Sequence, residues 1–272
     1  MGNYQNIIYE TPADKVLRIT LNRPERMNAM SPELLHELDQ AMDEFEQDQA
    51  LSVMIIRGAG RTFCTGYDLG ADQRRGSGSR IMRDRVAMQA LVTRWMRLWG
   101  LLKPTIAQVH GYCIAGGTEL AGHCDLVFAA EDASFGNQPG RTMGVLPTMS
   151  MWPTLMGPRR TKELFFTGDP FSARQALEWG LVNQVFPREK LDEETLNYAR
   201  RVAMVSAELL MLHKAAVNRY LEVTGIRAAE QSAADLDVIA HETDTVRNWM
   251  RMIKEKGLKA ALEARDGPFN RK

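Results

Sequence analysis

The sequence predicts an α/β protein in which strands and helices alternate over the first two thirds and helices fill the last third. Short apolar runs, such as residues 16–21 and 52–57, alternate with amphipathic segments such as residues 32–49. From Ser172 onward the apolar residues recur at helical spacing almost to the end. A chain of 272 residues with 44% hydrophobic and 25% charged residues has enough apolar mass for one large core.

Composition excludes several classes of function. Lys plus Arg and Asp plus Glu number 34 each, so no excess of positive charge exists to collect nucleic acid or anionic lipid. No apolar run approaches the roughly 18 residues that span a bilayer. The three cysteines lack metal-ligand spacing, and no basic-then-apolar signal pattern opens the chain. We therefore expect a cytoplasmic protein with reduced thiols, no metal, and no nucleic acid or membrane partner.

The first elements form a hairpin and a crossover unit. Residues 6–10 and 16–21 read as two strands joined by the turn formers of residues 11–14. Ser31 is an N-cap with Pro32 at the first helical position, and it opens an amphipathic helix that ends near residue 49. Residues 52–57 form the next strand, which is followed by a Gly-rich loop over residues 58–68.

Two Gly-rich loops are expected to converge. A polar Gly/Ser-rich stretch, residues 72–80, is expected to be mobile and precedes a helix over residues 82–102. Strands over 105–109 and 125–129 flank a loop, residues 111–117, and a helix that begins near Thr118 with Glu119 in its first turn. Ligand crevices of such sheets lie beyond the carboxyl ends of the strands, where loops 58–68 and 111–119 both emerge. Their backbone N–H groups have the chemistry of an oxyanion hole.

The C-terminal third is predicted to be helical. Ser172 and Gln175 form a capping box, and helices are expected over residues 191–204, 206–223, 226–242 and 243–264. We divide the chain into a core over residues 1–190 and a helical C-terminal region over residues 191–272.

Three segments in order carry a family resemblance: Asn22-Arg23-Pro24 with Asn28-Ala29-Met30, then Phe63-Cys64-Thr65-Gly66-Tyr67-Asp68-Leu69, then Gly111-Tyr112 through Gly116-Gly117-Thr118-Glu119-Leu120. Their order and spacing resemble the signatures of the crotonase superfamily, the enoyl-CoA hydratase/isomerase family. The similarity continues through Cys124-Asp125, Ser134-Phe135, residues 144–147 and residues 257–265, so it covers nearly the whole chain.

This resemblance implies a fold, an assembly and a ligand. The fold is a crotonase-like spiral of strand-strand-helix units with a helical C-terminal region that mediates trimerisation, commonly into trimers or hexamers. The ligand is an acyl-CoA thioester of the kind handled in fatty acid metabolism, in which coenzyme A is part of the substrate, so no separate cofactor is expected. Neither the acyl group nor the pathway follows from the sequence.

The resemblance also assigns residues. The backbone N–H groups of Tyr67 and Gly116 fall at the oxyanion positions, and Glu119 falls at the first of two acidic positions that activate water. A Glu in the first turn of a helix is also a routine dipole partner. The resemblance also implies coenzyme A contacts at Arg23, Arg26, Ala29, Asp68 as a turn acceptor, Phe269 and Lys272. At Arg23 and Arg26 the alternative is a solvated surface charge.

One position departs from the family pattern. The second carboxylate is replaced by Gly140, and the preceding stretch, residues 135–139, is one residue longer than usual. Either Glu119 works alone, or a polar group such as Asn137, Gln138 or Arg141 orients water or substrate, or the site only binds acyl-CoA. We predict an enoyl-CoA hydratase-like lyase. The alternatives are a thioester or C–C hydrolase of the same family and a non-catalytic acyl-CoA binder.

Overall fold

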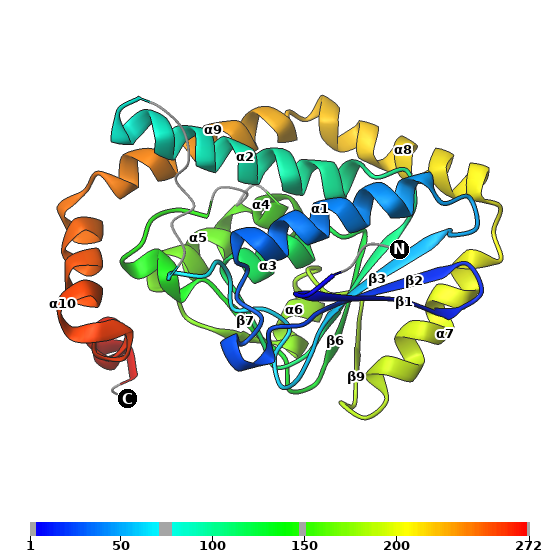
Figure 1. Ribbon diagram of the computed structural model, residues 1–272, viewed down its shortest axis with the longest axis horizontal. Coiled ribbons are helices and arrows are strands. Elements are labelled where there is room, and N and C mark those ends of the chain that lie inside the picture. The colour runs from blue at the N-terminus through cyan, green and yellow to red at the C-terminus, as the bar shows by residue number, and fades with distance from the viewer. Residues whose placement is uncertain (1–3, 71–77, 147–150, 271–272) are drawn as a thin grey trace.

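The computed structural model describes residues 4–70, 78–146 and 151–270. Within these residues a six-stranded sheet forms the centre of the molecule (Figure 1). Its strands, in spatial order, are β1 (Ile7–Ala13), β2 (Val16–Leu21), β3 (Val53–Gly58), β4 (Thr105–Val109), β6 (Leu126–Ala130) and β9 (Gln184–Phe186). β1 is antiparallel to β2, and the other neighbours are parallel.

The N-terminal hairpin is tighter than predicted. β1 continues through Pro12 to Ala13, with an irregular register after Glu10, so the predicted turn at residues 11–14 is wrong. Proline is tolerated here because β1 is the edge strand, where a missing N–H breaks no ladder bond. The turn lies at Asp14-Lys15, where Lys15 takes a φ of 59°.

The central strands β2, β3 and β4 are almost fully buried, as parallel strands covered on both faces are expected to be. Alternate residues of β2, β3 and β4 point to opposite faces. Leu17, Ile19, Met54, Ile56 and Ala107 join the larger core cluster, whereas Val16, Val53, Ile55 and Ile106 join a smaller one.

Helices α1 (Pro32–Gln47), α2 (Arg80–Gly100) and α3 (Gly116–Gly122) pack into the larger cluster. α1 begins as predicted, because the Ser31 hydroxyl accepts the Leu34 N–H at 3.3 Å and Pro32 occupies the first turn. α3 begins at Gly116, two residues earlier than predicted. Most of the 72–80 segment expected to be mobile lies outside the described residues.

A second, smaller sheet explains the repeating unit of the fold. Its strands are β5 (Tyr112–Ile114), β7 (Ser134–Gly136) and β8 (Phe171–Ser172), and a bridge between Cys64 and Cys113 extends it toward β3. β3, β4 and β6 are each followed by such a short segment and then by helix, which builds strand-strand-helix units. These strands of two or three residues were not predicted from the sequence.

The remaining elements follow in chain order: η1 (Pro24–Arg26), η2 (Gln138–Arg141), α4 (Met151–Met156), α5 (Pro158–Thr167), α6 (Ala173–Glu178), α7 (Leu191–Ala203), α8 (Ala207–Val223), α9 (Ile226–His241), α10 (Asp244–Asp266) and η3 (Gly267–Asn270). The predicted capping box at Ser172 and Gln175 is present. The predicted helix over 243–264 is interrupted at Gly257, whose φ is 83°.

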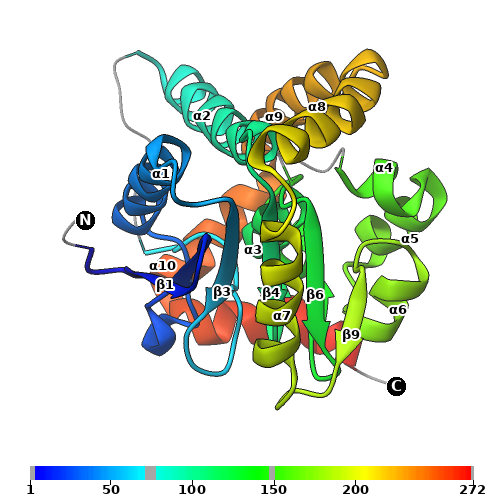
Figure 2. The same ribbon diagram turned by 90° about the vertical axis from the view of Figure 1, so that its right-hand side faces the viewer.

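The C-terminal helices divide between the sheet and the helical layer. α7 lies across the face of the sheet opposite to α1 and α3 (Figure 2), where Leu191 and Ala199 fill the smaller cluster. α9 packs along α2 (Figure 1). A domain boundary at residues 190/191 stays a prediction, since α7 itself packs on the sheet. None of the described helices is long and apolar enough to cross a bilayer.

Candidate active site

Glu119 lies in the first turn of α3, a helix whose residues are all buried. The Glu119 side chain is 3% exposed. Its helix starts abruptly because Ala115, the N-cap, has a φ of 51° and a ψ of −122°, a strained conformation that costs about 1–3 kcal/mol for a non-glycine residue. Such strain is held where surrounding structure over-determines it, and it is common at functional sites.

The loops that carry Tyr67 and Gly116 lie side by side. A Cβ added at Gly66 would stand 3.2 Å from Gly116 N, and one added at Gly116 would meet the Tyr67 ring at 2.8 Å. A bridge to Met30 fixes Tyr67, with Met30 N–H donating to Gly66 O at 2.8 Å and Asp68 N–H donating to Met30 O at 3.0 Å. Among the described residues, no backbone carbonyl accepts from the N–H of Tyr67 or Gly116. The Tyr67 and Gly116 amides therefore belong to adjacent loops, and neither is used by a backbone carbonyl of the described residues.

The Tyr67 side chain joins the same site. Its phenol donates to Glu119 Oε2 at 2.5 Å and accepts from Trp95 Nε1–H at 2.8 Å. Burial, together with the charge of Glu119 and the hydrogen bond to it, raises the pKa of Tyr67 well above 10.0. The phenol therefore stays protonated and acts as a fixed donor to the carboxylate. Sequence reasoning used only the backbone of Tyr67 and missed this contact; no local signal reveals a partner 52 positions away.

Three of the predicted coenzyme A contacts come together near η1. Arg23 donates to Ala29 O at 2.5 Å and to Asp68 Oδ2 at 2.9 Å. Partial burial raises the pKa of Asp68, but hydrogen bonds from Arg23 and Gly70 N–H and the charge of Arg23 lower it on balance. Asp68 is thus an ionised acceptor that holds Arg23, in agreement with its predicted role in the turn.

The other predicted contacts are spread out. Arg26 is exposed in η1, and it lowers the pKa of Asp68 only through its charge. Phe269, in η3, lies against the Arg141 guanidinium, with 3.7 Å between Arg141 Cζ and the ring centroid. Lys272 lies outside the described residues.

Gly140, where the second carboxylate is missing, sits in η2 beside two buried amides. A Cβ at Gly140 would stand 2.8 Å from Asn137 Nδ2. Asn137 Nδ2 and Gln138 Oε1 are both buried without a hydrogen-bond partner among the described residues. Either amide therefore has hydrogen-bonding capacity left for a ligand or a water.

Arg141, the third polar group considered at this loop, is committed elsewhere. It donates to Thr167 O at 2.8 Å and to Asp169 and Asp266, each at 3.0 Å, and it also stacks on Phe269. These contacts tie η2 to α5 and to the C-terminus. Arg141 is therefore a structural link rather than a group that orients water.

The cysteines carry no reactive thiol. Cys64, Cys113 and Cys124 are buried and free, and burial raises the pKa of the Cys64 and Cys124 thiols to about 12. The described residues contain no group of three or more His, Cys, Asp or Glu side chains suited to a metal ion.

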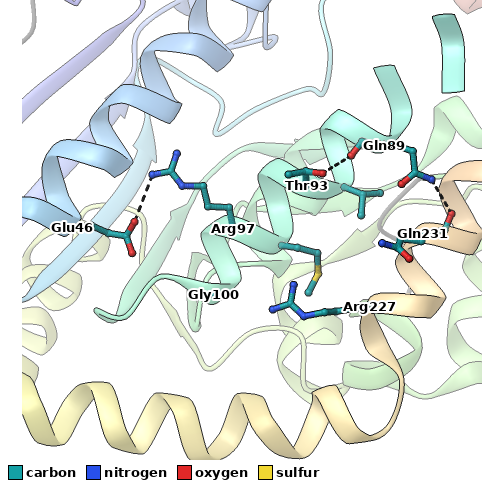
Figure 3. Close-up of a pocket in the computed structure, with 9 residues that line it drawn as sticks. Glu46, Gln89, Thr93, Arg97, Gly100, Arg227 and Gln231 are labelled. Carbon is teal, nitrogen blue, oxygen red and sulfur yellow. Dashed lines mark hydrogen bonds and ion pairs between the residues drawn. The ribbon is translucent and has the colours of Figure 1, made fainter. Parts of the chain in front are cut away.

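A surface groove of about 410 Å³ between α2 and α9 is separate from this site (Figure 3). It is lined in part by Glu46, Gln89, Arg97, Arg227 and Gln231. Arg97 pairs with Glu46 at 3.5 Å, and Gln89 donates to Gln231 O at 3.4 Å. The groove contains none of the predicted site residues.

Comparison with known proteins finds one family throughout. The model of the enoyl-CoA hydratase/isomerase family matches residues 11–272. A Rhizobium meliloti protein named "Probable enoyl-CoA hydratase" is 35% identical over 225 residues, which are 82% of this chain and 84% of that protein. The crystal structure of an enoyl-CoA hydratase/isomerase from Xanthobacter autotrophicus Py2 has a TM-score of 0.91 and 37% identity, covering 98% of this chain and 99% of that one. An enoyl-CoA hydratase structure from Mycobacterium smegmatis has a TM-score of 0.90 and 33% identity, and the match covers 98% of this chain and 94% of that one.

Proposed function

Since the chain belongs to the enoyl-CoA hydratase/isomerase family, we propose that it is an enoyl-CoA hydratase, a lyase that adds water across the double bond of a 2-enoyl-CoA thioester. The observation that carries this proposal is the placement of the Tyr67 and Gly116 amides side by side at the start of the helix that holds Glu119. The likeness to the Xanthobacter structure confirms the predicted crotonase-like spiral with a helical C-terminal region.

The two amides would bind the thioester carbonyl oxygen. When water adds at C3, electrons move onto that oxygen and form an enolate. Two N–H donors held by the backbone stabilise this charge without reorganising, and removal of one such donor typically costs about 3–4 kcal/mol. Gly66, with a φ of 96°, keeps the Tyr67 amide close to Gly116 without a side chain in between.

Glu119 would act as the general base. A carboxylate within hydrogen-bond reach of the water takes its proton as the C3–O bond forms, an effect of about 10²–10⁴-fold. The Tyr67 phenol holds Glu119 Oε2 in place, because Trp95 fixes the phenol in turn. The position of the base is thus set by two side chains, those of Tyr67 and Trp95, from separate parts of the fold.

The Arg23, Ala29 and Asp68 cluster would receive the nucleotide end of coenzyme A. Arg23 is held by Asp68, so its guanidinium keeps one orientation, and exposed Arg26 adds positive charge nearby. Phe269 and Lys272 stay predicted contacts. Coenzyme A is part of the substrate in this proposal, and no further cofactor is required.

Turnover of short and long trans-2-enoyl-CoA thioesters by the purified protein tests the proposal. Loss of the conjugated enoyl absorbance, with no release of free thiol, is the expected result. Thiol release would identify a thioester hydrolase, an alternative that the missing carboxylate at Gly140 favours. If the protein binds enoyl-CoA and produces neither signal, it is an acyl-CoA binder and the hydratase proposal fails.

We also propose self-association as a trimer or hexamer in the cytoplasm. α8 buries none of its residues. Several large apolar side chains along it are exposed, namely Leu209, Leu212, Val217, Tyr220 and Val223. Exposed apolar surface of this extent is typical of a protein contact. Sedimentation of the wild-type protein and of Leu212→Glu is the test, with a trimer or hexamer expected for the first and dissociation for the second.

A further inference from the structure

A cluster of two buried carboxyl groups and a partly exposed imidazole joins α2, α9 and the loop that follows Gly140. His241 Nδ1 hydrogen-bonds to Asp84 Oδ2 at 2.7 Å, and His241 Nε2 lies 3.5 Å from Asp237 Oδ2. Asp84 is 2% exposed and Asp237 is 4% exposed. Buried carboxyl groups are rare unless something uses or compensates them. Neither the family motifs nor the proposed mechanism accounts for this cluster.

Asp237 also holds the loop in which the second carboxylate is missing. Val145 N–H donates to Asp237 Oδ1 at 2.5 Å. Gly144, with a φ of 140°, packs against the same oxygen and leaves no room for a side chain there. The carboxyl group of Asp237 therefore reaches from α9 into the loop that Gly140 opens, only a few residues beyond the vacant position.

The negative charge of Glu119 is one of the charges that act on Asp237. Burial raises the pKa of Asp237 to about 7. The negative charges of Glu119 and Asp84 also raise this pKa, whereas His241 and the hydrogen bond from Val145 N–H lower it. These charged groups come from α9 itself, α2 and α3, whereas the residues 142–146 carry no titratable side chain. A carboxyl group with a pKa near the working pH is suited to both donating and accepting a proton.

His241 links this carboxyl group to solvent. Its side chain is 23% exposed, whereas those of its two carboxyl partners are almost fully buried. If Nδ1–H donates to Asp84, the neutral ring presents the Nε2 lone pair toward Asp237, which suits a protonated Asp237. Asp84 thus sets the tautomer of a ring that can relay protons.

We propose that Asp237 supplies the second acid–base group of the site, in place of the carboxylate absent at Gly140, and that His241 and Asp84 are its positioning residues. This inference rests on the proposed hydratase function and names the residue that completes it. It removes the need for Glu119 to serve C2 and C3 at once.

Every proton in the proposed hydration step has a donor and an acceptor. Glu119 takes one proton from water while the water oxygen bonds to C3, and the π electrons move to the thioester oxygen. The enolate then collapses, and Asp237 in its acid form gives its proton to C2. Glu119 is left protonated and Asp237 ionised; transfer of one proton from Glu119 to Asp237, directly or by exchange with water through His241, restores both.

Exchange of the C2 hydrogen of butyryl-CoA with D₂O, followed by NMR, isolates this role. A saturated thioester has no double bond to hydrate, so exchange needs the oxyanion hole and the group at C2. We expect Asp237→Asn to slow both exchange and hydration of crotonyl-CoA at least about 100-fold. We expect Glu119→Gln to abolish hydration and to keep exchange within about tenfold of the wild type. Asp235→Asn is the matched control, because Asp235 lies on the same helix with a side chain that is 48% exposed and pairs with Arg85 at 2.9 Å.

The pH profile separates positioning from mere packing. Because only protonated Asp237 donates, hydration should fall on the alkaline side with an apparent pKa of about 7. His241 lowers the pKa of Asp237 and Asp84 raises it, so His241→Gln should move this limb to higher pH and Asp84→Asn to lower pH. Two structural lesions would not shift the limb in opposite directions.

The outcomes distinguish the two proposals. If the wild type hydrates crotonyl-CoA and folded Asp237→Asn, verified by its circular dichroism, still hydrates and exchanges within about threefold of wild type, this inference is wrong and the hydratase proposal stands. If the wild type exchanges in an Asp237-dependent manner without hydrating, the hydratase proposal fails and the acid–base role of Asp237 stands. If it does neither, both fail.

Discussion

The phenol of Tyr67 donates a hydrogen bond to Glu119 Oε2 at 2.5 Å, and the Trp95 indole donates to that phenol at 2.8 Å. In the proposed mechanism Tyr67 thus contributes twice, because its amide would bind the thioester oxygen and its hydroxyl holds the Glu119 carboxylate. The raised pKa of the phenol, caused first by burial, keeps it a donor across the working pH range.

Tyr67→Phe separates these two contributions, because it keeps the amide and removes the hydroxyl. A hydrogen bond to a charged group contributes about 1.5–3 kcal/mol, so we expect kcat for enoyl-CoA hydration to fall about 10- to 100-fold with little change in KM. The variant should also unfold at lower temperature, because the buried Trp95 N–H loses its acceptor. Tyr112→Phe is the control, since Tyr112 is half exposed and its hydroxyl has no hydrogen-bond partner among the described residues. Equal kcat in Tyr67→Phe and the wild type would remove the phenol from the mechanism.

Gly66→Ala tests the proposed oxyanion hole. The new methyl group would stand 3.2 Å from Gly116 N and obstruct that amide, so kcat should fall about 10²–10³-fold, as it does when an oxyanion donor is lost. Backbone strain alone is controlled by Gly225→Ala, because Gly225 has a similar φ of 90° and no atom within 4 Å of an added Cβ. Comparable losses in both variants would mean that strain, not the amide, is responsible.

Arg26→Ala tests the coenzyme A end. Arg26 is exposed and acts on Asp68 only through its charge. Because the residue is exposed, its loss should leave the melting temperature unchanged. If it meets the nucleotide phosphates, KM for crotonyl-CoA should rise about fivefold, a loss of about 1 kcal/mol, while kcat stays constant. Crotonyl-pantetheine lacks the nucleotide and is the control substrate. An equal rise of KM for both thioesters would place Arg26 elsewhere.

Asp237→Asn should increase stability at neutral pH while it lowers activity. The folded protein holds the Asp237 proton up to a pKa of about 7, against 3.8 for the unfolded chain, so it binds more protons than the unfolded chain between these values. Stability from this group is therefore complete below about pH 4 and is lost as pH rises to about 7.

The amide cannot ionise, so the variant escapes this loss. Relative to the wild type, its free energy of unfolding should improve by about 4 kcal/mol between pH 4 and pH 8, an upper bound set by the size of the pKa shift. Urea unfolding of both proteins at the two pH values measures it. A difference that does not depend on pH would show that Asp237 is ionised at an ordinary pKa in the folded protein.

The sequence predicted the long elements well, because their signals are local. α1 follows from the Ser31 cap, Pro32 and the apolar face behind them, and β3 from the apolar run over residues 53–56. β5, β7 and β8 span two or three residues, which is too short for any period to show. α3 starts at Gly116 rather than Thr118 because Ala115 takes a positive φ, which composition does not reveal.

The two loops of the candidate site could be predicted from the sequence, but the side-chain contacts between residues far apart in the chain could not. Gly66-Tyr67 and Gly116 to Glu119 sit in loops whose strands end at the same edge of the sheet, so their approach could be anticipated. The Tyr67 phenol depends on how far a side chain reaches across the fold. The contact of His241 with Asp84 joins residues 157 positions apart, and only the packing of α9 along α2 creates it.

The central claim, that Glu119 is the general base of hydration, is tested most directly by single-turnover hydration of crotonyl-CoA by Glu119→Gln. The amide oxygen can still accept from Tyr67, so the site should keep its shape and bind butyryl-CoA with unchanged affinity. We predict a rate at least about 10³-fold below the wild type. A rate within tenfold of the wild type, with the same affinity, would contradict the account and assign water activation to another group.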